Sequence, residues 1–193
     1  MNIHNFKPVI AGASLLVTSF FSSTSFADTF NVDPVHSIAN FSVGHLGLAK
    51  VQGRFNDVSG SFSYDPTKPE NTEVTIVINA NSVDSNHDKR DQHLRSPDFF
   101  DAKQFPKIVF KSTQYTGNKS LGLIEGDLTM HGITKKMTFS VQVIGEGNDP
   151  WGGYRMGALV TGSVKRSEFG IDYFIPGVSD EVSVVFSVEA IRQ

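Results

Sequence analysis

The sequence predicts an all-β domain of about eight strands with one short helix. Apolar and polar residues alternate along most of the chain, as in residues 137–143 and 182–188. A period of two places one set of side chains on one face of a sheet. Short, turn-like segments separate these stretches, and sequential hairpins favour antiparallel neighbours. Such a sheet can roll up around its apolar face, and the enclosed space is the first candidate for a functional site.

Residues 1–27 predict a signal peptide rather than part of the fold. Lys7 precedes an apolar run over residues 9–21, and Ser25 and Ala27 suit signal peptidase, so we place the cleavage before Asp28. The run is about 14 residues, shorter than the roughly 20 needed to span a bilayer. We therefore expect an exported mature chain, residues 28–193, that forms a single domain without an integral membrane segment.

The composition excludes several classes of function. The chain has no cysteine, so disulfides and thiolate metal sites are excluded. Its net charge is −3 at neutral pH, and removal of residues 1–27 removes Lys7 and leaves −4. A mildly acidic protein of this kind lacks the basic footprint of a nucleic-acid partner or of anionic lipid surfaces.

The strands are expected at residues 36–44, 53–65, 72–80, 107–115, 121–130, 135–145, 154–165 and 181–191. The spacing from Phe55 to Val58 breaks the alternation and predicts a bulge near Asp57. Glycines inside the strand patterns indicate bends or close approaches, and a small barrel needs such bends to close; they are Gly44, Gly60, Gly126, Gly157 and Gly162. A two-sheet sandwich is the alternative architecture.

The segment after residue 83 departs from the strand pattern. Asp84 or Ser85 can cap a helix, which we place over residues 85–94. An aromatic loop follows over residues 97–105, with phenylalanines at 99, 100 and 105. The helix and the loop together predict a lid over one end of the sheet.

Metal and catalytic signatures are weak. The five histidines of the mature chain have no metal-ligand spacing; they are His36, His45, His87, His93 and His131. The chain has no nucleophile elbow, phosphate loop or dinucleotide fingerprint. We therefore predict neither a metal site nor an enzyme.

The densest cluster of charges lies in residues 90–101. The simpler interpretation is a solvated helix face with ion pairs. The functional interpretation turns Arg90 or Arg95 inward at the mouth of the barrel, where a guanidinium could hold the polar head of a lipid. Lys165 and Arg166, at the end of a strand, are second candidates for this contact.

Several longer phrases resemble a known family. They are SVDSNH (82–87), RDQHLRSPDFF (90–100), FPKIVFKST (105–113), GDLTMHGITK (126–135) and DPWGG (149–153). Together they resemble the YceI family of periplasmic proteins, from about Phe30 to the C-terminus. The resemblance implies an extended lipocalin-like, eight-stranded antiparallel β-barrel with one short helix near residues 85–95. It also implies a long apolar tunnel for a polyisoprenoid or an isoprenoid quinone.

The resulting prediction is a periplasmic binding or carrier protein for a long-chain isoprenoid lipid, with no cofactor required beyond that lipid. The head of the lipid is expected near Arg90, His93 or Arg95. The wall of the tunnel is expected to include Phe41, Phe55, Leu94, Phe99, Phe110, Leu128, Met130, Phe139 and Phe169. The alternatives are an enzyme of lipid or quinone metabolism that uses the same tunnel, and a closed, ligand-free module that acts through partner proteins. The oligomeric state stays open, with a homodimer as one option.

Overall fold

The computed structural model describes Met1 and residues 27–193. The predicted signal peptide, residues 1–27, falls almost entirely on residues outside the described part and stays a prediction. None of the helices in the described part is both long enough and apolar enough to cross a membrane.

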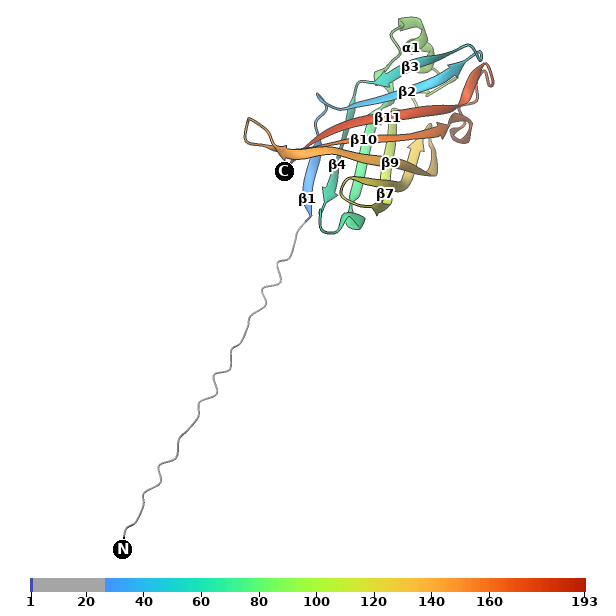
Figure 1. Cartoon of the computed structure of the whole chain (residues 1–193). Coiled ribbons are helices and arrows are strands. Elements are labelled where there is room, and N and C mark those ends of the chain that lie inside the picture. Colours follow the sequence, from blue (N-terminus) through green and yellow to red (C-terminus); the bar gives the residue numbers. More distant parts are fainter. Residues whose placement is uncertain (2–26) are drawn as a thin grey trace.

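A closed antiparallel ring of eight strands forms the body of the molecule, and it confirms the predicted barrel (Figure 1). The ring runs β1-β4-β5-β7-β8-β9-β10-β11 and closes because β1 pairs with both β4 and β11. These strands are β1 (Asp28–Val32), β4 (Val58–Tyr64), β5 (Glu73–Asn79), β7 (Lys107–Gly117), β8 (Leu121–Met130), β9 (Ile133–Asn148), β10 (Tyr154–Lys165) and β11 (Val178–Arg192).

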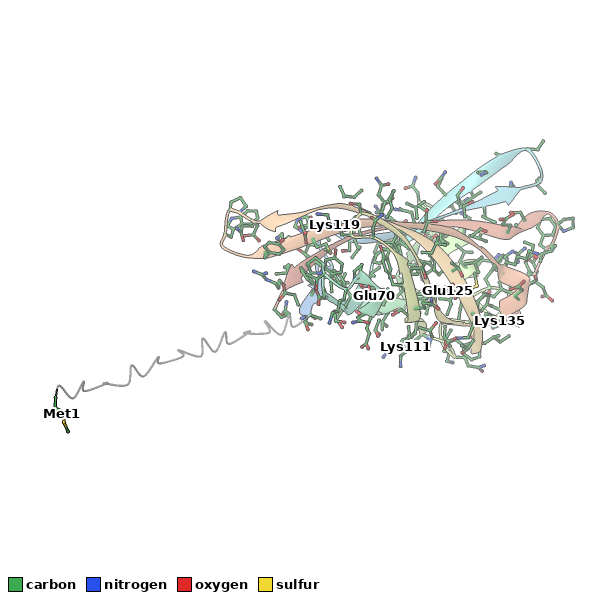
Figure 2. All side chains as sticks on the ribbon, turned by 60° about the horizontal axis from the view of Figure 1, so that its bottom comes forward. Met1, Glu70, Lys111, Lys119, Glu125 and Lys135 are labelled. Atoms are coloured by element: carbon green, nitrogen blue, oxygen red, sulfur yellow. The ribbon has the colours of Figure 1, made fainter. Side chains whose placement is uncertain are left out.

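Three further strands extend the sheet from the edge of β11 opposite β10, beside β1; they are β2 (Ile38–His45), β3 (Ala49–Phe55) and β6 (Val83–Asp84). The hairpin of β2 and β3 projects from the barrel at one end (Figure 2). Because β11 is 15 residues long, it pairs with β2 along its first part and with β1 at its last residues.

The register puts the alternating apolar residues inside the ring. Ala158, Val160 and their partners on β11, Val188 and Phe186, stand on the inner face. Charged residues such as Lys111 of β7 are exposed (Figure 2). Period-two patterning therefore sorts the side chains as the sequence predicts.

One predicted strand is two. The range 53–65 divides into the end of β3 and the whole of β4, with the break at Asn56 and Asp57. The backbone N–H of Asn56 donates to the carbonyl of Ser82 at 3.1 Å, and the N–H of Asp57 donates to the Ser82 hydroxyl at 3.0 Å. These bonds to the short 3₁₀ helix Ala80–Ser82 replace ladder bonds, so the predicted irregularity near Asp57 ends a strand.

The helix α1 (Asp88–Leu94) begins three residues later than expected, and His87 caps it in place of Asp84 or Ser85. The His87 ring accepts a hydrogen bond from the Arg90 N–H at 3.3 Å. Ser85 instead donates its N–H and its hydroxyl to the buried carboxylate of Asp91. Asp84 accepts from Arg54 at 3.1 Å, so neither side chain is free to cap.

The two ends of the barrel are built differently. At the α1 end lie α1, residues 97–106 and the 3₁₀ helix η3 (Arg166–Phe169); the Phe105 ring lies 4.9 Å from that of His131, which bonds the Phe169 carbonyl at 3.0 Å. At the opposite end, which we call the β1 end, Phe30 stacks on Phe62 with 5.0 Å between the ring centroids. The rings at the β1 end belong to a small, separate buried cluster.

An ion cluster fastens several segments at the β1 end. The Arg155 guanidinium lies 2.7 Å from Asp33, 2.7 Å from Asp149 and 2.6 Å from Glu189. It thereby joins the turn after β1, the β9–β10 hairpin and β11. Hydrogen bonds from His36 and Arg155 hold the pKa of Asp33 well below its usual range, and Arg155 lowers that of Asp149.

Acid is expected to destabilise the barrel through this cluster. The pKa of each carboxyl is lowered in the fold below its ordinary 3.8, so both favour folding above that value. The stability is lost as the pH falls from about 5 towards 2, because the unfolded chain then binds more protons. The melting temperature should therefore fall more steeply with decreasing pH for the wild type than for the double variant Asp33→Asn/Asp149→Asn, as thermal unfolding measured across this pH range would show. Equal slopes would contradict the assignment.

Candidate ligand-binding cavity

The inside of the barrel is not filled by its own side chains. A cavity of about 300 Å³ runs between the two ends, from Val164 and Ile171 at the α1 end to Tyr64 and Met156 at the β1 end. Along β10 alone, the eight-residue step from Met156 to Val164 corresponds to roughly 26 Å of strand. The volume is at the lower end of the range for ligand pockets, and the shape is elongated.

Almost all of the wall is apolar, and it is also the hydrophobic core of the domain. Eight of the nine predicted wall residues border the cavity; they are Phe41, Phe55, Leu94, Phe99, Phe110, Leu128, Met130 and Phe139. Period-two alternation brings the strand residues of this set to one surface. Contact of any of them with a ligand stays a prediction.

Phe169 does not border the cavity. It ends η3, its surface is fully buried, and it belongs to the main core cluster. The next residue, Gly170, has a φ of 73°, in the left-handed region that favours glycine. Phe169 therefore packs in the core at the α1 end. Strand alternation cannot predict the direction of its side chain, because η3 is a helical turn.

The three predicted head-group residues also lie away from the wall, and each has hydrogen-bond partners within the protein. Arg90 donates to the carbonyl of Ser85 at 2.6 Å. Arg95 donates to the carbonyl of Val83 at 2.7 Å, which fastens α1 to β6. His93 Nε2 lies 2.8 Å from a carboxylate oxygen of Asp98. These bonds stabilise the lid, and a role in ligand contact stays a prediction for all three.

Arg166, one of the two second candidates, does border the cavity. It follows β10 as the first residue of η3, and only 5% of its surface is exposed. Its guanidinium carbon lies 6.0 Å from the centroid of the Phe99 ring, which is also part of the wall. The sequence signal for Arg166 was its place at the end of a predicted strand. Lys165, the other second candidate, is exposed.

Large rings of the wall pack against glycines of the neighbouring strand, and this close packing leaves room in the cavity. A Cβ added at Gly53 would lie 2.2 Å from the ring of Phe41, and one added at Gly162 would lie 2.6 Å from the ring of Phe139. The same arrangement pairs Phe110 with Gly126 at 2.6 Å and Tyr115 with Gly122 at 2.3 Å. Such contacts are possible only for glycine, and they keep ring volume against the wall and out of the centre.

The phenols of the wall are neutral groups. Burial raises the pKa of Tyr64 and of Tyr115 above the ordinary 10.0. The Tyr115 hydroxyl donates to the carbonyl of Asn118 at 2.7 Å. The β1 end of the cavity therefore presents uncharged surface to an occupant.

One group of residues has metal-like geometry, but it lies in the Arg155 cluster. Ligand atoms of Asp33, His36 and Glu189 lie within 4.8 Å of one another. The Arg155 guanidinium already contacts both carboxylates. A cation at this place would have to displace an arginine, so the described geometry favours an ion-pair cluster over a metal site.

Comparison with solved structures finds the same barrel. The Campylobacter jejuni YceI protein is 29% identical, with a TM-score of 0.71 over 78% of this chain and 90% of that chain. BcnA of Burkholderia cenocepacia is 23% identical, with a TM-score of 0.74 over 82% of this chain and 98% of its own. A polyisoprenoid-binding domain of Saccharophagus degradans is 17% identical, with a TM-score of 0.66 over 85% of this chain and 98% of that domain. The last two likenesses concern the fold alone.

Sequence comparison finds relatives along nearly the whole chain. A UPF0312 protein of Pseudomonas paraeruginosa is 40% identical over 189 residues, which are 97% of this chain and 99% of that protein. One of Yersinia enterocolitica is 38% identical, with coverage of 97% and 98%. The family model described as the YceI-like domain matches residues 30–190. The chain therefore belongs to the YceI family.

Proposed function

We propose that this chain is a periplasmic binding or carrier protein that holds a long-chain isoprenoid lipid, a polyisoprenoid or an isoprenoid quinone, inside the barrel. The observation that carries the proposal is the elongated apolar cavity between the two ends of the ring. The shared fold with a domain described as polyisoprenoid-binding supports it. The predicted signal peptide supports export to the periplasm.

Apolar burial supplies the affinity in this proposal. Each CH₂ group that leaves water contributes roughly 0.8 kcal/mol. A chain of many carbons can bind tightly with few polar contacts, although the ordering of a flexible tail takes back part of the gain. Rings fixed over glycines set the width of the cavity. Recognition of the tail is therefore strict in cross-section and tolerant of length.

The wall gives no specific support to the enzyme alternative. Among the described residues of the wall, the titratable groups are Tyr64, Tyr115 and Arg166. The two phenols have raised pKa values, and a guanidinium does not exchange its proton near neutral pH. General acid–base catalysis needs a group whose pKa lies near the working pH.

The first test is the mass of the protein isolated from its own host. Native mass spectrometry under gentle conditions should show the mature chain with a bound lipid, and extraction should release a molecule with an isoprenoid repeat. The same spectrum reports whether the protein is a monomer or a homodimer, and whether cleavage precedes Asp28. A clean ligand-free mass in repeated preparations would count against the binding function.

The second test narrows the cavity without changing the polarity of its wall. Gly162→Ala should push the Phe139 ring inward, because the added Cβ would lie 2.6 Å from that ring. We expect lipid affinity to fall on the order of tenfold, since overpacking costs about 1–3 kcal/mol. Titration with a long-chain isoprenoid quinone measures the loss.

The same strand offers a matched control. A Cβ added at Gly157 has its nearest neighbour at 3.9 Å, so Gly157→Ala should bind as the wild type does. Adding Phe139→Leu to Gly162→Ala removes the obstructing ring and should restore affinity. If Gly162→Ala melts normally and binds like Gly157→Ala, the cavity is not the place where the lipid sits.

A further inference from the structure

Arg166 stands apart from the rest of the cavity wall. It is the one charged residue among the described residues that border the cavity. It is 5% exposed, which is rare for arginine unless the charge is paired. A buried charge that meets an apolar space needs a physical explanation.

The hydrogen bonds of Arg166 are all to backbone carbonyls. Nε donates to Ser179 at 2.9 Å, Nη1 to Ile171 at 2.9 Å and Nη2 to Val178 at 2.7 Å. A guanidinium has five N–H donors, so these three bonds leave two without a partner. Within residues 27–193, no carboxylate lies within 4.0 Å of it.

Other arginines of the chain are satisfied in different ways. Arg155 contacts three carboxylates, and Arg95 lies outside the cavity wall with its bonds made to the segment before α1. Burial lowers the pKa of Arg166, and the carboxylates of Asp180 and Asp172, both beyond ion-pair distance, offset only part of this effect. What is particular to Arg166 is that an incompletely paired guanidinium is buried and borders the cavity.

The position of the guanidinium is fixed. Two of its bonds reach the first residues of β11, the third reaches the loop after η3, and the Phe99 ring lies against it at 6.0 Å. Bonds of this kind orient the group before any ligand arrives. A preorganised donor loses little conformational freedom on binding.

We propose that Arg166 receives an accepting oxygen on the head of the bound lipid, so that the head lies at the α1 end and the tail extends towards Tyr64 and Met156. The ligand class is then a long isoprenoid chain that ends in a carbonyl, hydroxyl or phosphate oxygen, rather than a bare hydrocarbon. This inference rests on the proposed function. It replaces the head-group contacts that the sequence suggested on α1.

The cavity also offers a rival place for the head. The Thr72 hydroxyl, at the β1 end, is buried, borders the cavity and has no hydrogen-bond partner. It is a neutral group and can bond to one oxygen of a ligand, whereas Arg166 is charged and has two spare donors. A hydrogen bond to a charged group contributes more than one between neutral groups. The two positions predict opposite orientations of the same lipid.

The experiment varies the head group of the lipid and the polar residue at each end of the cavity. Ligand-free wild type, Arg166→Met and Thr72→Val are titrated with three probes of equal chain length: a polyisoprene hydrocarbon, the corresponding quinone and the corresponding monophosphate. We expect the wild type to bind at least one oxygen-bearing probe about tenfold or more tighter than the hydrocarbon. Arg166→Met should lose this preference and still bind the hydrocarbon, whereas Thr72→Val should keep the preference.

The outcomes separate the inference from the function on which it rests. Equal affinity of the wild type for all three probes overturns the role of Arg166 and leaves a tail-binding function intact. Loss of the preference in Thr72→Val alone overturns the orientation. Failure of the wild type to bind any probe overturns the proposed function and the inference together. If Arg166→Met does not fold, the affinities of the wild type and of Thr72→Val for the three probes still test the orientation. The relative affinities for the quinone and the monophosphate identify the kind of oxygen that is bound.

Discussion

Contact between aromatic rings and the backbone of glycines is the constraint on which the rest of the structure depends. An eight-stranded ring encloses a space just wide enough for side chains to fill it or for one slender ligand. Phe41, Phe110 and Phe139 are large enough to close that space if they pointed to its centre. Because each lies over a glycine of the next strand, the domain gains the apolar burial of a core and keeps an empty axis.

The two most heavily hydrogen-bonded arginines differ in their position relative to the cavity. Arg155 lies among three carboxylates where segments of the β1 end meet, so its charge is balanced within the protein. Arg166 borders the cavity with carbonyls alone as partners. The charge of Arg155 is paired with carboxylates, whereas the Arg166 guanidinium keeps two N–H groups without a partner beside the cavity. The two arginines thus separate the structural electrostatics from those of the candidate site.

Alternation predicted an antiparallel sheet and the inward face of its strands, because a period of two determines which face each residue takes, whereas the choice of a barrel over a sandwich came from the resemblance to the YceI family. Alternation failed where the backbone leaves the sheet: Phe169 lies in a helical turn, and the predicted strand over residues 53–65 breaks where Ser82 bonds the backbone. The head-group contacts expected on α1 could not be judged from sequence, because Arg95 bonds to carbonyls of another segment. Which ring lies over which glycine depends on the register between neighbouring strands, and the spacing of residues along one strand does not determine that register.

The ring is closed by the two strands that are farthest apart in the described sequence. Phe30 is opposite Arg192, and the backbone N–H of Gln193 donates to the carbonyl of Thr29 at 2.9 Å. Of all the neighbouring strands in the ring, these two therefore close the longest loop of chain, and closing such a loop costs the most conformational entropy. Until this seam forms, the strands make a curved, open sheet whose apolar face is accessible to solvent. An open sheet of this kind is prone to aggregation during folding, because both its apolar face and its unpaired strand edges are exposed.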